Sequence, residues 1–258
     1  MTAFGIVLLA AAAAQAAEPL ICADRPAKGN AVCTVPAGRV QLETGAIDWT
    51  LTRAAGARTE LTTWASSFIK LGLSDQSDVE VGFTPYARQT AKQDGSRDRV
   101  SGFGDVIVRF KHRLTRDGAR VEAGIIPFVK VPTATRGLGN DKWEGGLAVP
   151  VTFALAGATT MTLGPELDWL ADADGHGHHV ATVHLVNVGL PVADRLSFAA
   201  ELWTNFNFDP AGTVKQASAD AALAYALSNS VQADVGTNLG LTRDAADVEL
   251  YGGVSVRF

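Results

Sequence analysis

The sequence of 258 residues lacks, beyond its first sixteen residues, any apolar run long enough to cross a bilayer as a helix, although 47% of its residues are hydrophobic. A helical span needs about 20 consecutive apolar residues. Any membrane crossing must therefore be made by strands closed into a barrel, because an open sheet edge would leave backbone groups without partners in lipid. The chain also lacks an excess of basic charge, and its net charge of −5 argues against nucleic acid as a partner.

Cysteine is nearly absent, since the whole chain has two, Cys22 and Cys33. Both lie in a segment, 17–38, that precedes the first expected strand. In a compartment where disulfides persist, this placement predicts a Cys22–Cys33 disulfide that closes a small loop in a periplasmic leader. The residues before Cys22 do not favour lipidation, because they are not small, and two thiolates without a nearby histidine do not favour a metal site.

The start of the chain resembles a secretory signal peptide. An apolar run from Phe4 to Ala14 is closed by Ala14-Gln15-Ala16, which has the small-x-small pattern of a cleavage site. The predicted signal peptide is therefore 1–16, although no Lys or Arg precedes the apolar run.

The last eleven residues predict a strand with one apolar and one polar face, because their side chains alternate in character. The apolar face holds Val248, Leu250, Gly252, Val254, Val256 and Phe258, and the other face holds Glu249, Tyr251, Gly253, Ser255 and Arg257. An aromatic residue at the end of such a strand resembles the assembly signal of bacterial outer-membrane barrels. The barrel-assembly machinery would then be a partner through Phe258. The alternative is the closing strand of a soluble β-sandwich.

About twelve segments with a similar rhythm follow the leader, and tight turns alternate with longer loops between them. They are 39–51, 59–73, 78–88, 102–114, 119–131, 143–156, 159–171, 179–191, 195–208, 215–227, 230–241 and 247–258. The pattern predicts an all-β fold, in which 39–258 forms a single closed antiparallel up-and-down barrel of about 12 strands in the bacterial outer membrane. Because short turns face the periplasm in such barrels, both termini are expected there.

The five tryptophans indicate an interfacial aromatic girdle. Trp49, Trp64, Trp143 and Trp169 fall at the predicted outer ends of strands, and Trp203 falls in the outer half of its strand. The alternative is tryptophan scattered through a core.

Alternation also predicts which charged side chains line the lumen. They are Glu43, Glu80, Asp105, Arg109, Lys111, Glu122, Lys130, Glu166, Asp168, Glu201, Asp220, Asp234, Glu249 and Arg257. Acids concentrate on the seventh to eleventh segments, while bases lie on the fourth and fifth, so an open pore would carry a transverse field. The alternative is that the charges pair and fill the lumen, as they do in small barrels.

One predicted outer loop gathers histidines, namely His176, His178 and His179, close to Asp172 and Asp174. Imidazole and carboxylate together can bind zinc, nickel or copper. A glycine-rich surface loop does not enforce a ligand geometry, so the sequence favours a solvated loop, and we assign no metal and no cofactor.

Several motifs together resemble the outer-membrane proteins grouped as the MetA-pathway of phenol degradation family, whose members are described as transporters. The motifs are Asp24-Arg25-Pro26, Val35-Pro36-Ala37-Gly38-Arg39 through Gly45, Leu71-Gly72-Leu73-Ser74-Asp75, Gly102-Phe103-Gly104-Asp105 and Phe128-Val129-Lys130-Val131-Pro132-Thr133. The resemblance implies passive or facilitated passage of small solutes, including aromatic or hydrophobic compounds, across the outer membrane.

Two other functions are weighed against transport. A plugged barrel could serve structure or surface interaction, with lipopolysaccharide phosphates contacting Arg97 and Arg99 in a charged outer loop, 88–101. A lipid-modifying enzyme would need a serine beside His112 or His184, and no spacing identifies one. We therefore expect no enzyme and no catalytic residue. Outer-membrane lipid and lipopolysaccharide are the expected surroundings, and the solute is not identified.

Overall fold

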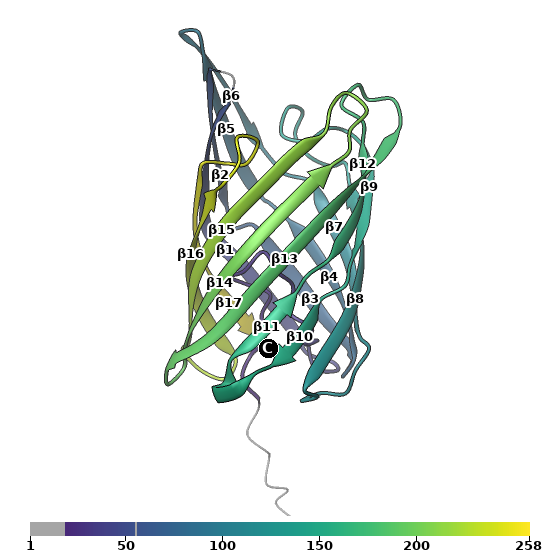
Figure 1. The fold of residues 1–258 in the computed structure, drawn as a ribbon, viewed down its shortest axis with the longest axis vertical. Helices are drawn as coiled ribbons and strands as arrows, with labels where there is room; N and C mark the ends of the chain where they lie inside the picture. The colour runs from purple at the N-terminus through teal and green to yellow at the C-terminus, as the bar shows by residue number, and fades with distance from the viewer. Residues whose placement is uncertain (1–18, 55) are drawn as a thin grey trace, which may run out of the picture.

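The computed structural model describes residues 19–54 and 56–258, so the predicted signal peptide at 1–16 lies outside the described residues. No helix in the described ranges is long and apolar enough to span a bilayer. Figure 1 shows the seventeen strands, which form one sheet. They are β1 (Val40–Ala54), β2 (Ala57–Trp64), β3 (Ser67–Ser74), β4 (Ser77–Phe83), β5 (Tyr86–Gln93), β6 (Ser96–Gly102), β7 (Val106–Arg113), β8 (Val121–Val131), β9 (Glu144–Ala148), β10 (Val151–Ala154), β11 (Thr160–Leu163), β12 (Glu166–Ala171), β13 (His178–Ala193), β14 (Leu196–Asn207), β15 (Val214–Ala226), β16 (Val231–Gly240) and β17 (Val248–Arg257).

The seventeen strands make twelve barrel strands, because five barrel strands are each interrupted once. The interrupted pairs are β2–β3, β4–β5, β6–β7, β9–β10 and β11–β12. Pro85, Pro150 and Pro165 lie at three of the interruptions, where a residue without an N–H cannot continue the ladder. The sheet closes where β1 pairs antiparallel with β17, from Gln41 opposite Arg257 to Leu51 opposite Val248. The predicted closed antiparallel barrel is confirmed.

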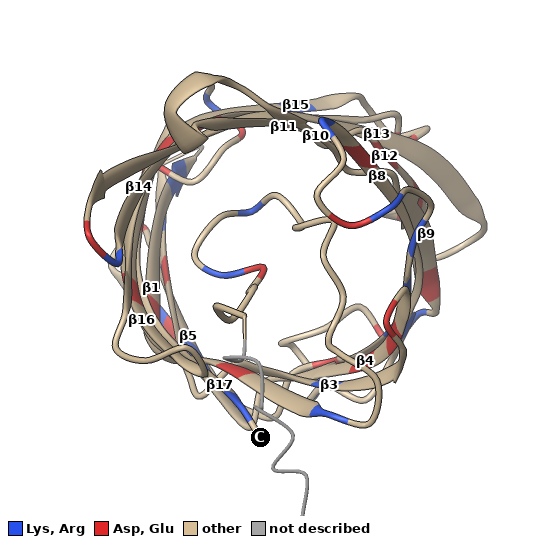
Figure 2. Ribbon diagram, turned by 90° about the horizontal axis from the view of Figure 1, so that it is seen from below, with Lys and Arg blue, Asp and Glu red and all other residues tan. Residues whose placement is uncertain are grey.

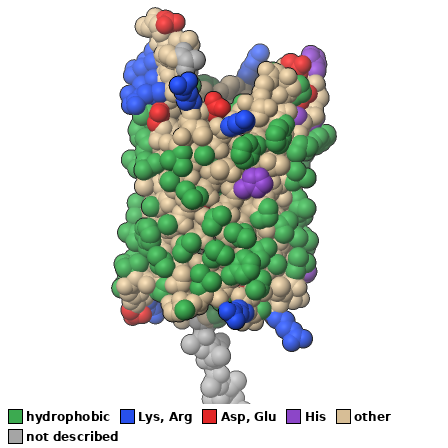
Figure 3. All heavy atoms as spheres, in the orientation of Figure 1, with side chains coloured by type: hydrophobic (Ala, Val, Ile, Leu, Met, Phe, Trp, Pro, Cys, Tyr) green, Lys and Arg blue, Asp and Glu red, His purple; other side chains and the backbone are tan. Residues whose placement is uncertain are grey.

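Side chains alternate between lumen and exterior along each barrel strand. On β3, for example, Ile69 and Leu71 are exposed while Lys70 is 2% exposed. On the face seen in Figure 3, hydrophobic side chains form a belt, with charged side chains above and below it. We call the rim that carries Pro19 and Phe258 the lower rim and the opposite one the upper rim (Figure 1).

The prediction that residues 88–101 form an outer loop is wrong, because these residues form most of a β-hairpin. Gln93 pairs with Ser96 across a two-residue turn, Asp94-Gly95, in which both φ angles are positive, at 49° and 82°. This is the backbone of a type I′ turn, for which Asp-Gly is a strong signal. The high charge of the segment obscured that signal. The hairpin β5–β6 rises above the upper rim (Figure 1).

Trp203 also departs from the prediction, because it faces the lumen and does not belong to an outer girdle. It shares its face of β14 with Glu201 and Asn205, and its ring lies 4.7 Å from Lys28 Nζ. Trp143 and Trp169 are each 56% exposed on the outside. Trp64 packs against Tyr86 with ring centroids 5.3 Å apart.

Candidate functional site

The leader lies inside the barrel, which corrects the expectation that it hangs in the periplasm. Figure 2, a view from below, shows this part of the chain crossing the space enclosed by the strands. It enters at the lower rim, where Arg257 donates a hydrogen bond to Pro19 O (2.7 Å). A disulfide joins Cys22 to Cys33, so that the intervening residues form a closed loop. We call residues 22–33 the leader loop.

Asp24 anchors the leader loop to one wall of the lumen. Its carboxylate lies 2.7 Å from Lys111 Nζ and 3.2 Å from Arg109, and it also pairs with Lys70. Burial alone raises the pKa of the Asp24 carboxyl, but Lys111, Lys70 and Arg109 outweigh burial and hold that pKa well below its ordinary value. Glu43 accepts the backbone N–H groups of Asp24 and Arg25 on the same side.

The opposite wall holds the cationic residues of the leader loop. Arg25 pairs with Asp234 on β16 at 2.8 Å, and Lys28 Nζ lies 3.1 Å from Asp220 on β15. Glu201 on β14 accepts the backbone N–H groups of Lys28 and Gly29, each at 3.2 Å. The acid of the loop thus lies among Lys70, Arg109 and Lys111, and its bases lie beside Asp220 and Asp234.

The predicted pore-lining residues differ in their surroundings. Buried are Glu43, Glu80, Lys111, Asp168, Glu201, Asp220, Asp234 and Arg257, and half-buried are Asp105, Arg109, Glu122, Lys130, Glu166 and Glu249. Lys130 belongs to a separate group near the upper rim, 2.8 Å from Glu144 and 3.3 Å from Asp105. Glu122 accepts a hydrogen bond from the Gly118 N–H at a lower turn. Glu249 accepts one from the side-chain amide of Asn238.

Most wall residues that hold the leader are among the predicted lumen-lining residues, but Lys70 and the partners of the leader's own charges are not indicated by the sequence. Lys70 was not predicted to line the lumen, although its position between Ile69 and Leu71 carries the alternation signal. Asp24, Arg25 and Lys28 were assigned to the leader without any partner. No local pattern identifies their partners, since the contacts join residues up to 209 positions apart.

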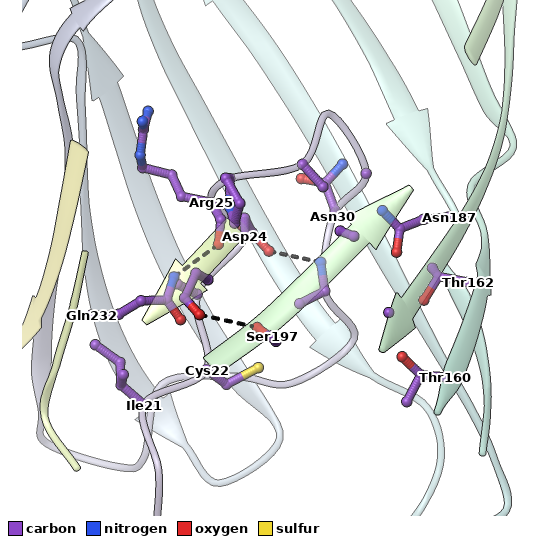
Figure 4. Close-up of a pocket in the computed structure, with 18 of the residues that line it drawn as sticks. Ile21, Cys22, Asp24, Arg25, Asn30, Thr160, Thr162, Asn187, Ser197 and Gln232 are labelled. Atoms are coloured by element: carbon purple, nitrogen blue, oxygen red, sulfur yellow. Dashed lines mark hydrogen bonds between the residues drawn. The ribbon is translucent and has the colours of Figure 1, made fainter. Parts of the chain in front are cut away.

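Three cavities surround the inner part of the leader loop, and a fourth, of about 470 Å³, lies beside its disulfide. Figure 4 shows one of about 370 Å³ near the lower rim, lined by the leader together with Thr160, Thr162 and Asn187. Two others, of about 300 and 220 Å³, lie against the barrel walls, and Lys28 and Asn30 line both. Asn30 lines all three cavities, so the tip of the leader loop separates them.

The histidine-rich loop is more ordered than predicted. His179 Nδ1 lies 2.8 Å from Asp172 Oδ1 and 3.7 Å from Asp209 Oδ2. These three residues each offer one potential metal-ligand atom, and the three atoms lie within 4.8 Å of one another. Backbone N–H groups of the two adjoining loops already bond Asp209 and lower its pKa. His178 bonds Trp143 O and stacks on Trp169, so the three loop histidines do not converge on one point.

A serine lies beside His112, which the sequence did not indicate. Ser77 Oγ is 2.8 Å from His112 Nδ1, across the β4–β7 ladder. Within residues 19–54 and 56–258, no carboxylate or amide bonds the second ring nitrogen of His112. A nucleophilic triad needs such a group to orient the imidazole.

The family model described as MetA-pathway of phenol degradation matches residues 23–258. Among solved structures, the COG4313 outer membrane channel from Pseudomonas putida F1 is similar over 90% of this chain and 100% of its own, at 15% identity and a TM-score of 0.72. The translocator domain of autotransporter NalP from Neisseria meningitidis is similar over 87% of this chain and 90% of its own, at 12% identity and a TM-score of 0.54. No curated protein matches this sequence. The chain therefore belongs to the MetA-pathway of phenol degradation family and is a twelve-stranded barrel of the bacterial outer membrane.

Proposed function

We propose that this barrel provides a passive or facilitated route for small solutes across the outer membrane, and that the leader loop is the plug that controls the route. The observation that carries the proposal is the loop itself, which crosses the lumen on non-covalent contacts with both walls while cavities remain around it. The lower rim, which holds both described termini, would face the periplasm.

The walls around the loop suit a route for polar or amphipathic solutes. The 220 Å³ cavity combines the acids Glu166 and Asp168 with the indole of Trp203 and the apolar side chains of Val183 and Leu185. Such a mixture offers both a polar edge and an apolar surface to an aromatic compound. The description of the family, which names phenol degradation, supports aromatic or hydrophobic compounds as the solute class.

A plugged barrel without transport is the second candidate. The ion pairs around Asp24 favour it, because Lys70 and Lys111 are each only 2% exposed and such pairs are costly to break. We assign no catalytic residue in either case. The Ser77–His112 pair lacks an orienting third group, and His184 lies beside Phe206 on the outer surface.

Single-channel conductance of the refolded protein in a planar bilayer tests the proposal. We expect rare or small steps from the parent and larger, more frequent steps from Asp24→Asn, because this variant loses the anchor of the plug. Asp117→Asn removes an exposed acid at a lower turn and serves as the matched control. Asp168→Asn and Lys130→Gln should each shift the ion selectivity of the steps.

Liposome swelling then addresses the solute class. Proteoliposomes with the Asp24→Asn variant should admit 4-hydroxybenzoate faster than arabinose if the lumen favours aromatic compounds. Equal rates would remove the aromatic preference while leaving the route itself. If every variant folds, as judged by heat-modifiable gel mobility, and none conducts, the barrel is structural and the transport proposal fails.

A further inference from the structure

A row of four cations crosses four adjacent strands near the upper rim. Arg53 on β1 lies opposite Arg58 on β2, Arg58 lies opposite Lys92 on β5, and Lys92 lies opposite Arg97 on β6. Directly opposed residues share one face of a sheet, so all four side chains project from the same side. Neighbouring strands lie about 4.8 Å apart, which gives the row a span of about 14 Å. All four residues are exposed.

The row lies on the outer face of the barrel. Arg99 lies two residues from Arg97 on β6 and opposes Thr90 on β5. Arg88 lies two residues from Thr90 on β5, so it shares the same face. Arg88 lies over the rings of Trp64 and Tyr86, at 5.4 and 5.8 Å. Trp64 in turn opposes Ile47, which is 48% exposed. The opposite face of these strands carries Asp48 and Thr63, bonded to each other at 3.2 Å.

The six bases have little compensation from the protein. We call Arg53, Arg58, Arg88, Lys92, Arg97 and Arg99 the basic patch. At the register positions of this face, the acid among the described residues is Glu60, which pairs with Arg58 at 2.7 Å. Like charges placed directly opposite each other destabilise a sheet pair. An anion bound across the four strands would relieve the repulsion within the row.

We propose that the basic patch binds the phosphate groups of lipopolysaccharide in the outer leaflet. Figure 3 shows basic side chains gathered at the upper left, directly above the hydrophobic belt, where Figure 1 places β5 and β6. Lipid phosphates occupy this height, and the Trp64–Tyr86 pair marks the interface just below it. Guanidinium groups bind phosphate through paired hydrogen bonds, and five of the six bases are arginines. A dense row suits a headgroup that carries several phosphates.

The test compares the parent with Lys92→Gln/Arg97→Gln and with Arg116→Gln/Arg120→Gln, which removes the same charge from a lower turn. Binding of purified lipopolysaccharide to the full chain in neutral detergent is measured by titration. Each base near an anionic lipid surface contributes about 1 kcal/mol, or roughly fivefold, so the patch variant should bind about 30-fold more weakly. The lower-turn control should match the parent.

Thermal unfolding supplies a second readout, because the patch residues repel one another when no anion is bound. Without lipid, the patch variant should melt no lower than the parent. At one lipid concentration, lipopolysaccharide should raise the melting temperature of the parent and of the lower-turn control more than that of the patch variant. Dephosphorylated lipopolysaccharide and phosphatidylglycerol should give little shift.

Three outcomes would overturn the proposal. Equal binding by the parent and the patch variant would show that the patch does not hold the lipid. An equal shift with phosphatidylglycerol would show a general response to anions. A shift to dimers that depends on the patch and occurs without lipid would assign the surface to a second copy of the chain.

Discussion

Replacing Asp24 with asparagine should release the leader loop, because one carboxylate joins that loop to three cations of the barrel wall. Asparagine keeps the size of the side chain and can still accept the Ala31 N–H bond, which has a length of 2.8 Å in the parent. It loses the charge that faces Lys70, Arg109 and Lys111. The perturbation therefore removes the electrostatic anchor and leaves the disulfide and the backbone of the loop in place.

The loss of docking free energy in Asp24→Asn depends on which acids still pair with Lys70 and Lys111. Removing one partner of a buried ion pair costs about 3 to 5 kcal/mol. Lys70 keeps Glu43 at 2.6 Å and Lys111 keeps Glu80 at 3.4 Å, so the lower value applies. A loss of about 3 kcal/mol raises the undocked fraction of the loop by roughly 100-fold.

Trypsin cleavage after Lys28 measures that fraction. Lys28 is held against Asp220 and Ser218 inside the lumen, so cleavage requires undocking, and its rate follows the open population when the loop re-docks quickly. Because Cys22–Cys33 keeps the two cleavage products together, they are separated by reduction before mass spectrometry. Asp117→Asn is the control. An Asp24→Asn rate within threefold of the parent would refute the assignment of Asp24 as the anchor.

Three further predictions concern the same loop and the upper rim. Since the pKa of docked Asp24 is held below its ordinary value, the contribution of its carboxylate to docking is full above that ordinary value and is lost as the pH falls through the docked value. The frequency of conductance steps of the parent in a planar bilayer should therefore stay flat from about pH 8 to 5 and rise only below about 4, and a rise between pH 7 and 5 would contradict the anchor. Replacing Cys22 and Cys33 with serine removes a cross-link that stabilises the ordered loop by about 3 kcal/mol. Trypsin cleavage after Lys28 should therefore speed up, while the melting temperature of the barrel, measured by circular dichroism, should stay the same. His179→Gln should loosen the two upper loops that meet at Asp209, seen as faster hydrogen exchange at the Ala173 and Ala211 amides with no change at the lower rim.

For Trp203, the alternation of side chains and the position along the strand give opposite predictions. Trp203 shares the phase of Glu201 and Asn205, so the alternation of its own strand already places it in the lumen. Its position along the strand, in the outer half, is what suggests a girdle. The Asp94-Gly95 turn likewise carries a local hairpin signal, although the segment around it is rich in charge.

The sequence by itself determined that the chain forms about twelve barrel strands and which faces of most of them are polar. These properties follow from a period of two residues within each strand and from turn residues between strands, both of which are local. The tertiary structure alone decided where the leader lies, which wall charges meet Asp24, Arg25 and Lys28, and that four cations form one row. Those contacts depend on closure and register, which bring together residues that are far apart in the chain and that carry no shared local pattern.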